Sequence, residues 1–349
     1  MTATIRPGRD ADAAGFIALI RACWSEYPGI VFDLDGEVPE LRALAAYYAA
    51  QGGALWAAED MQGRLVGMIA VRPEAEGEWE ICRLYVDRAE RGSGLAACLL
   101  ATAEAHAVAA GAARLALWSD TRFDRAHRFY EKHSYVRRGP IRALNDLSHS
   151  LEYGYAKPQA GIAVLDAAAA ASAVPRLAAL LVDCVASGAS VSFLSPLGRD
   201  VALAYWRARA RAVAEGRRVL LAGWAGGVLA GAVMLDLDTP ANQPHRAEVK
   251  KLLVDPAHRR RGLGRALLAR AEAEAVAAGR SLLTLDTRAG DAGEALYRAA
   301  GWTVAGRIPG YAQNPDGSLG DTVIFYRQAS VLPLTFAALR SEGKGSAGH

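Results

Sequence analysis

Residues 247–268 have the residue types and the spacing of a phosphate-binding site. Residues 249–254 predict a buried strand, Asp255 and Pro256 predict a turn, and the Ala/Leu-rich stretch after them predicts a helix. Free backbone N–H groups and the helix dipole attract anions to the start of a helix. Four arginines add full positive charges there: Arg259, Arg260, Arg261 and Arg265. The sequence therefore predicts a ligand that carries phosphate groups.

The glycine spacing distinguishes between the known kinds of phosphate-binding loop. A dinucleotide fold requires GxGxxG directly after the strand, and a P-loop requires Lys followed by Ser or Thr after its last glycine. The sequence has neither, and instead has Arg259, Gly262 and Gly264 in an RxxGxG arrangement. This arrangement, with its strand, turn and helix, resembles the acyl-CoA pyrophosphate loop of the GNAT superfamily of N-acyltransferases. In that loop, Gln or Arg is followed after two intervening residues by Gly, and after one more intervening residue by Gly or Ala.

The same pattern occurs a second time, 168 residues upstream. Eight residues match at this constant separation: Glu80, Arg83, Leu84, Val86, Asp87, Arg91, Gly94 and Ala96 match Glu248, Lys251, Leu252, Val254, Asp255, Arg259, Gly262 and Gly264. Three flanking matches have separations of 164 to 167 positions: Gly67 with Gly231, Asp120 with Asp286, and Tyr130 with Tyr297. Loop insertions in a duplicated domain produce this small drift. We therefore predict two units of one fold.

The resemblance implies the fold and the division of the chain. It implies an α/β protein of two tandem GNAT domains, each a mixed, mostly antiparallel β-sheet flanked by helices, with splayed central strands. We expect an N-terminal GNAT domain at residues 1–158, a C-terminal GNAT domain at 160–329 and a flexible tail at 330–349. A chain of 349 residues is long enough for two domains that each bury a core.

The composition argues against several other classes of protein. With 52% hydrophobic and 22% charged residues, the chain is globular rather than disordered or fibrous. A net charge of +3 is too small to predict nucleic-acid binding. The four cysteines lack metal-ligand spacing, so we expect reduced thiols and no metal site. We also expect no apolar run of membrane-spanning length and no signal peptide, and therefore a cytoplasmic location.

The resemblance implies that each loop binds the pyrophosphate of acetyl-CoA, and that the strand before it pairs with the pantetheine. In the second unit the implied cofactor-binding residues are Leu252, Leu253, Val254, Arg259, Arg260, Arg261, Gly262, Leu263, Gly264 and Arg265. In the first unit they are Leu84, Tyr85, Val86, Arg91, Gly92, Ser93, Gly94, Leu95 and Ala96.

Glu248 is the candidate general base. An ammonium group with a pKa of about 10 must lose a proton before it can attack a thioester. Glu248 lies six residues before Val254, so the two side chains share one face of a regular strand. Glu80 repeats this position in the first unit. The structural alternative for Glu248 is an ion pair with Lys250 or Arg246.

Tyr297 is the candidate partner of the departing sulfur, a position that the resemblance implies. A phenol with a pKa of about 10 can donate a hydrogen bond to a thiolate. The alternative is an aromatic residue of the core. Tyr130 is the counterpart in the first unit. The family's usual Asn seven residues before the tyrosine is absent, because Phe123 and Gly290 occupy those positions.

The two units are not equivalent in charge. The upstream loop has Arg91 with Glu90 beside it, whereas the downstream loop has three consecutive arginines. Attraction for pyrophosphate is therefore weaker upstream. We expect the C-terminal unit to be the principal catalytic site and the N-terminal unit to be a second enzyme or a scaffold. Asp286 and Asp120 would either contact the acceptor amine or cap the next turn.

These features predict an acetyl-CoA-dependent N-acetyltransferase that acts on a primary amine of a small molecule. Two alternatives remain open: a tandem acyltransferase similar to mycothiol synthases, and a non-catalytic acyl-CoA-binding sensor or interaction protein. The second unit also resembles acetyltransferases that confer tabtoxin resistance, which implies an amino-acid-like or dipeptide amine. We expect a monomer with an internal pseudo-dimer, and neither nucleic acid nor membrane as a partner. The sequence does not identify the acceptor amine.

Overall fold

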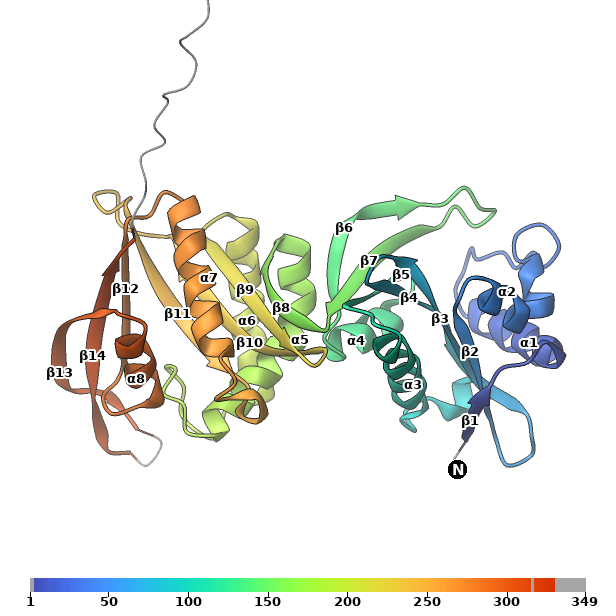
Figure 1. The fold of residues 1–349 in the computed structure, drawn as a ribbon, viewed down its shortest axis with the longest axis horizontal. Helices are drawn as coiled ribbons and strands as arrows, with labels where there is room; N and C mark the ends of the chain where they lie inside the picture. Colours follow the sequence, from blue (N-terminus) through green and yellow to red (C-terminus); the bar gives the residue numbers. More distant parts are fainter. Residues whose placement is uncertain (1–2, 315–316, 330–349) are drawn as a thin grey trace, which may run out of the picture.

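The structure is a computed structural model that describes residues 3–314 and 317–329. It contains two seven-stranded sheets flanked by helices (Figure 1). The first sheet consists of β1 (Thr4–Pro7), β2 (Ala54–Glu59), β3 (Leu65–Ala75), β4 (Glu78–Val86), β5 (Arg114–Asp120), β6 (Val136–Ala143) and β7 (Leu151–Pro158). The second consists of β8 (Ala160–Leu165), β9 (Arg218–Ala225), β10 (Val228–Asp236), β11 (Arg246–Val254), β12 (Leu282–Arg288), β13 (Thr303–Gln313) and β14 (Leu319–Gln328). The predicted tail at 330–349 lies outside the described residues.

Eight α-helices of the described residues are interspersed with these strands. Those of the first half are α1 (Ala13–Trp24), α2 (Leu44–Ala50), α3 (Leu95–Ala109) and α4 (Asp124–Lys132). Those of the second half are α5 (Ala167–Ala186), α6 (Arg199–Ala214), α7 (Leu263–Ala277) and α8 (Ala292–Ala299). Short 3-10 helices lie at Asp10–Asp12, Pro39–Ala43, Arg88–Glu90 and Pro256–His258.

The two sheets have one topology. The strand order is β1-β2-β3-β4-β5-β7-β6 in the first sheet and β8-β9-β10-β11-β12-β14-β13 in the second. In each sheet the two central strands form a parallel pair and the other neighbours are antiparallel. The predicted fold class, two mixed and mostly antiparallel sheets flanked by helices, is therefore confirmed.

The central strands separate at corresponding positions in the two sheets. β4 and β5 pair from Glu78 only as far as Glu80, which lies opposite Ala116. β11 and β12 pair only as far as Glu248, which lies opposite Thr284. Beyond these glutamates the strands diverge, and backbone groups of β4 and β11 no longer bond to the parallel neighbour. The predicted splay thus begins at the two glutamates predicted as general bases.

A one-residue bulge interrupts β11 just beyond the splay. Its pairing with β10 shifts at Lys251, whose φ is 54°. Because a bulge reverses the alternation of side chains, Val249 packs with α7 and α8, whereas Leu253 packs with α5 and α6. The expectation that Glu248 and Val254 share one face is therefore wrong. β4 has the same bulge at Arg83, whose φ is 52°.

Glycines at matched positions let one helix approach each sheet closely. A Cβ on Gly231 would lie 2.7 Å from Leu267 Cδ1 of α7. A Cβ on Gly67 would lie 2.9 Å from Leu99 Cδ1 of α3. This contact explains why the glycine pair recurs in both halves: each glycine allows a buried leucine of the helix to rest on the strand backbone.

The longest helix, α5, corrects the expectation about apolar runs. Its 20 residues have a mean hydropathy of 1.6, so it is long and apolar enough to cross a membrane by length and composition. Most of it is buried inside the protein, where Leu177, Leu180 and Leu181 pack beneath the second sheet. The alanine-rich stretch is therefore a core helix. Core helices are commonly long and apolar enough to meet the same criteria of length and composition.

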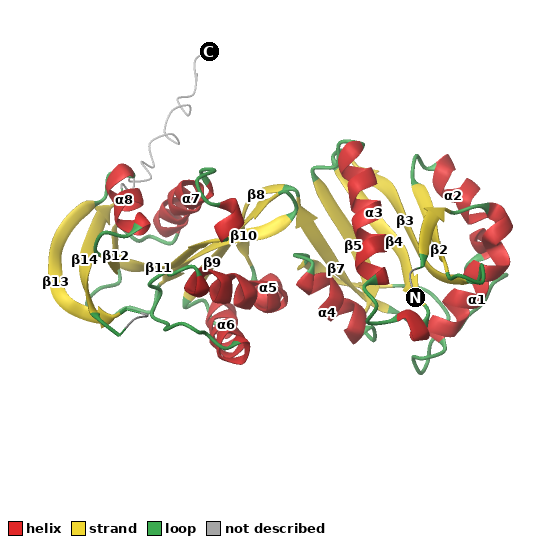
Figure 2. Cartoon of the chain, turned by 90° about the horizontal axis from the view of Figure 1, so that it is seen from below, coloured by secondary structure: helices red, strands yellow, loops and turns green. Residues whose placement is uncertain are grey.

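The two halves meet through α5. This helix packs against β6 and α4, and Val136 of β6 belongs to the α5 core (Figures 1 and 2). The indole Nε1 of Trp224 donates a buried hydrogen bond of 3.1 Å to the Ser134 carbonyl. The backbone N–H of Arg137 donates one of 2.8 Å to Ser172 Oγ. The second half therefore packs on the first mainly through α5, with apolar contacts and satisfied polar groups.

Candidate active site

A cavity of about 900 Å³ in the C-terminal half brings the predicted site residues together. It is lined by the downstream loop, the splayed end of β11, the start of α8 and residues 187–193. Glu248, Tyr297, Leu252, Leu253, Val254, Arg259, Arg260, Gly262, Leu263, Gly264 and Arg265 all contribute to its wall. Arg261, the remaining predicted cofactor-binding residue of this half, is exposed and is absent from that wall.

The downstream loop presents its backbone N–H groups at the start of α7. Arg260 and Gly262 have φ values of 63° and 88°, which turn the chain sharply into the helix. In the described chain, no acceptor bonds to the N–H groups of Gly262, Leu263 and Gly264. Together with the helix dipole and the arginines, these groups form a site for a multiply charged anion.

Arg259 is held without a neutralising carboxylate. Its Nε donates 3.1 Å to the Val254 carbonyl, and a terminal nitrogen donates 2.7 Å to Ser187 Oγ. Neither partner carries a charge, and no described carboxylate forms an ion pair with Arg259. Its positive charge therefore remains available to a ligand.

The upstream arginine has a different partner at the matching position. Arg91 Nε likewise donates to the Val86 carbonyl, at 3.3 Å, but its terminal nitrogens bond to both carboxylate oxygens of Glu26 at 2.6 and 2.7 Å. Glu26 lies three residues after Cys23, as Ser187 lies three residues after Cys184. The two cysteines bond to equivalent strand carbonyls, so the positions correspond. Glu26 therefore neutralises the charge of Arg91, whereas Ser187 leaves the charge of Arg259 available to a ligand.

The other predicted upstream loop residues are also tied to their neighbours. Ser93 Oγ donates 2.7 Å to the Glu90 carbonyl and accepts at 3.3 Å from the Leu95 N–H, one of the groups expected to face pyrophosphate. Tyr85 is partly buried, and its hydroxyl accepts a hydrogen bond of 2.9 Å from Trp24 Nε1. Gly92 and Gly94 have φ values of 85° and 92° and retain the loop geometry. Leu84, Val86 and Ala96 pack around the α3 core.

Glu248 lies at the apex of the splay and is about one third exposed. Its carboxylate accepts at 3.0 Å from Lys250 Nζ, which lies 3.3 Å from Asp236 as well. Asp236 is also paired with Arg218 at 2.9 Å. The predicted ion pair with Lys250 is present, but Lys250 is shared between two carboxylates and the cavity reaches Glu248. Glu248 therefore forms an ion pair with Lys250 and is also accessible from the cavity.

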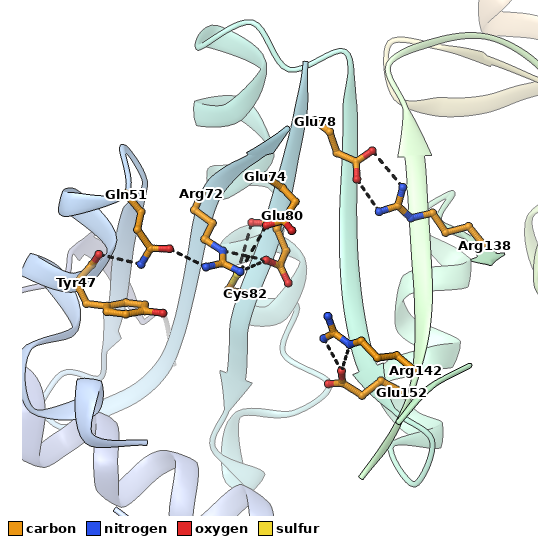
Figure 3. Close-up of polar contacts among 10 residues, drawn as sticks. All are labelled: Tyr47, Gln51, Arg72, Glu74, Glu78, Glu80, Cys82, Arg138, Arg142 and Glu152. Carbon is orange, nitrogen blue, oxygen red and sulfur yellow. Dashed lines mark hydrogen bonds and ion pairs between the residues drawn. The ribbon is translucent and has the colours of Figure 1, made fainter. Parts of the chain in front are cut away.

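Glu80 has a much tighter partner. Both Arg72 Nε and a terminal nitrogen donate to the same Glu80 oxygen, at 2.9 and 2.7 Å, and Arg72 is braced by Gln51 at 2.6 Å (Figure 3). Asp236 occupies the position of Arg72 in the second sheet, opposite Glu248. The same strand position thus carries opposite charges in the two halves, and only Glu80 has an arginine across from it.

Ion pairs continue across the first sheet beside Glu80. Glu78 of β4 is bound by Arg138 of β6 at 2.5 Å, and Arg142 is bound by Glu152 of β7 at 2.5 Å (Figure 3). The Arg138 guanidinium holds the pKa of Glu78 below its usual value in spite of burial. Glu78 lies opposite Arg114 at the start of β5, whereas Glu152 lies opposite Asp120 at its end, so the two pairs stabilise different parts of the first sheet.

Tyr297 is buried at the wall of the cavity, against Phe325 and Trp302. Burial, reinforced by the charge of Asp286, raises the pKa of Tyr297 above its usual value. The phenol therefore stays protonated at neutral pH and can donate a hydrogen bond. Burial also raises the pKa of Tyr130, which packs against Tyr135 and Tyr155. Each tyrosine is thus a core aromatic, and Tyr297 also borders the cavity.

The strand-end aspartates differ in role. Asp120 is buried and accepts from both the backbone and the guanidinium of Arg122 at 2.6 to 2.8 Å, which is the predicted turn cap. Asp286 is exposed, receives a bond of 3.4 Å from Thr322 Oγ1, and lines the cavity. Asp286 is therefore placed where an acceptor amine could reach it.

Three residues of the cavity were not singled out from the sequence. Lys251 is the bulge residue, Arg209 comes from α6, and Ser187 binds Arg259. The match of Arg83 with Lys251 was a signal for a cation at the bulge. No sequence signal marked Arg209, because its approach to β11 depends on how α6 packs.

The sequence profile of the acetyltransferase (GNAT) family matches residues 16–135 and 191–302. The chain is similar to yncA of Salmonella typhimurium, solved with its cofactor acetyl-CoA, at 23% identity over 49% of this chain and 95% of that one, with a TM-score of 0.40. It is also similar to the ribosomal-protein-S18-alanine N-acetyltransferase of Escherichia coli, at 25% identity over 49% and 94% of the two chains, with a TM-score of 0.37. Because the family profile matches both halves, the chain belongs to the acetyltransferase (GNAT) family and carries two tandem copies of its domain.

Proposed function

We propose that this acetyltransferase uses acetyl-CoA to acetylate a primary amine of a small molecule, and that the C-terminal half is the principal catalytic site. The observation that carries the proposal is the 900 Å³ cavity, which joins an unneutralised anion-binding loop to Glu248 and Tyr297. In the first half the equivalent arginine and glutamate are both paired.

The residues present fit acetyl-CoA. The N–H groups at the start of α7 and the charges of Arg259, Arg260 and Arg265 would hold the pyrophosphate. The backbone of Leu252, Leu253 and Val254 lies beyond the splay, where it can accept an added strand-like chain. When bound, acetyl-CoA supplies an acetyl group activated as a thioester.

The chain's own groups would then move protons and orient the acceptor. Glu248 accepts a proton from the ammonium through water, because its carboxylate reaches the cavity. Tyr297 remains protonated and donates a hydrogen bond where negative charge develops on sulfur. A backbone N–H of β11 beyond Glu248 would polarise the thioester carbonyl of bound acetyl-CoA. This division of roles requires no metal ligand from the chain.

The proposal also covers the oligomeric state, the location and the partners of the protein. We propose a monomer with an internal pseudo-dimer, which the junction buried by α5 supports. We also propose a cytoplasmic location and a small-molecule substrate, with neither nucleic acid nor membrane as a partner. Residues 1–158 and 160–329 would be the two domains, with the first as a scaffold.

The first experiment measures acetyl-CoA binding. Binding at 100 times the dissociation constant stabilises a protein by about 2.7 kcal/mol, which a thermal-shift assay detects. Arg259→Gln should weaken binding by about 10- to 100-fold, since it removes a charged hydrogen-bond donor. Arg91→Gln, the matched control, should leave the dissociation constant unchanged. Failure of the wild-type protein to bind acetyl-CoA would refute the proposal.

The second experiment separates catalysis from mere binding. Release of CoA is followed with a panel of primary amines for the wild-type protein and for Glu248→Gln. The variant should bind acetyl-CoA normally and lose about 100-fold in kcat/KM, the typical contribution of a general base. Tight binding with no turnover on any amine would instead establish a non-catalytic acyl-CoA sensor.

A further inference from the structure

Two cations in the cavity wall have no carboxylate partner. Arg209 of α6 and Lys251 of β11 form no ion pair with any described carboxylate, although both line the cavity. Lys251 Nζ has one neutral contact, 3.1 Å from Ser192 Oγ. Arg209 Nε is buried and has no hydrogen-bond partner among the described residues. Both charged groups lie over the ring of Tyr205, at 4.3 Å for Arg209 and 5.8 Å for Lys251.

This arrangement is costly without a ligand. A buried donor that lacks an acceptor loses the hydrogen bonds that it made in water, and two like charges beside one ring repel each other. Desolvation at this position is strong enough to lower the pKa of Lys251 to about 8. Burial is the main cause, and Lys250 and Arg209 add to it, whereas Asp286 and Glu248 oppose it.

The first half shows how a cation at the same bulge can be paired within the chain. Arg83, the counterpart of Lys251, has the same positive φ at the same bulge. Its guanidinium is ion-paired with Glu40, which precedes α2. In the second half the helix that packs over the bulge supplies Arg209 instead of a carboxylate. No described carboxylate forms a direct ion pair with Lys251 or Arg209, so an anionic group of a ligand can take the place that Glu40 holds in the first half.

We propose that Arg209 and Lys251 together bind an anionic group, a carboxylate or a phosphate, on the acceptor, so that the substrate is an amine that also carries a negative charge. The inference rests on the proposed function and specifies its substrate class. An arginine fork and an ammonium group match the oxygens of such a group, and Tyr205 holds both cations in place.

The remainder of the cavity suits the opposite end of such a molecule. Glu248 and Asp286, both carboxylates, line the same space from β11 and β12. They attract the ammonium group, while Arg209 and Lys251 attract the acid. An amine of this kind is therefore oriented by charge at both ends, with its nitrogen on the side of the splay where Glu248 lies.

The test compares each amine that carries an acidic group with an analogue in which that group is neutral or absent. The common amino acids are paired with their carboxamides, and phosphoethanolamine with ethanolamine, at saturating acetyl-CoA. The acid member of at least one pair should have about a 10-fold or greater advantage in kcat/KM. Preference for carboxylates or for phosphoethanolamine identifies which anion is bound. Equal or better turnover of every neutral member would overturn the inference.

Variants assign the preference to the two cations. Arg209→Met and Lys251→Met should each raise KM for the acid about 10-fold or more while leaving the carboxamide unchanged. Arg209→Lys should restore part of the preference. Arg207→Met, on the exposed side of α6, is the matched control and should change nothing. An equal loss for acid and carboxamide would mean that these residues have only a structural role, and would overturn the inference.

The two proposals fail differently. If the wild-type protein binds acetyl-CoA and acetylates neutral amines without preference, the substrate class is wrong and the acetyltransferase function stands. If acetyl-CoA does not bind at all, the proposed function fails and the inference fails with it.

Discussion

At the scale of single residues, the two halves place the same side chains in different electrostatic surroundings. Glu80 and Glu248 occupy one strand position, yet an arginine lies opposite the first and an aspartate opposite the second. Arg91 is paired with Glu26, whereas Arg259 contacts only neutral oxygens. Each half therefore supplies the matched control for substitutions in the other.

Tyr297→Phe should lower kcat by about 100-fold, with little change in KM for acetyl-CoA. Burial raises the pKa of this phenol, so the wild-type hydroxyl remains a donor throughout the neutral range, and the loss should not depend on pH. Steady-state kinetics from pH 6 to 9 measure this. Tyr130→Phe is the control, and an equal loss in that variant would place catalysis in both halves.

Lys251 should give the acidic acceptor a pH dependence. Its pKa of about 8 means that the ammonium is charged below pH 8 and loses its charge as the pH rises through that value. The advantage of the wild-type protein over Lys251→Met, in kcat/KM for one acidic amine, should therefore be greatest below pH 8 and shrink above it. A constant advantage up to pH 10 would contradict this assignment.

At the scale of elements, the bulge decides which side chains reach the cavity. A regular strand would have placed Glu248 and Val254 on one face, and the sequence contains nothing that marks the extra residue. The bulge depends on the pairing of β11 with β10, a contact between distant segments. Secondary structure and the helix start could be predicted from local patterns, and the splay from the family resemblance, whereas this change of face could not be predicted.

Gly231→Ala should destabilise the protein by about 1–3 kcal/mol, because its Cβ would meet Leu267 Cδ1 at 2.7 Å in a packed core. Gly264→Ala is the control, since its Cβ would lie 3.5 Å from its nearest neighbours and the upstream loop already has alanine there. Urea unfolding of both variants measures the difference. Equal stabilities would show that α7 can shift away from the strand at no cost.

At the scale of the whole molecule, the duplication was readable from the sequence because the loops, glycines and tyrosines recur at nearly constant separation. The inequality of the two sites was only partly readable. Glu90 and the three arginines indicated it, but the decisive partners, Glu26 for Arg91 and Arg209 beside Lys251, come from segments distant in the chain. Sequence patterns indicate which groups are present, and tertiary packing determines which of them remain unpaired.

Acetyl-CoA should bind with a stoichiometry of one per chain, although the chain has two loops. Glu26 cancels the charge of Arg91, and its carboxylate repels an incoming pyrophosphate. Isothermal titration calorimetry measures the stoichiometry directly, and Arg259→Gln should weaken the single observed site. Two equivalents of similar affinity would contradict the proposal that the first half is a scaffold.

The contact between Glu26 and Arg91 has an evolutionary consequence. The first half keeps the loop, the glycines and the splay, so the charge difference between the two sites depends on a few acidic side chains rather than on a lost fold. Glu26→Ser would give Arg91 the surroundings that Arg259 already has. If the first half is the scaffold that we propose, a substitution at one position would restore a free arginine in a loop whose backbone geometry is already present, so a duplicated chain of this kind could gain a second cofactor site without any change of fold.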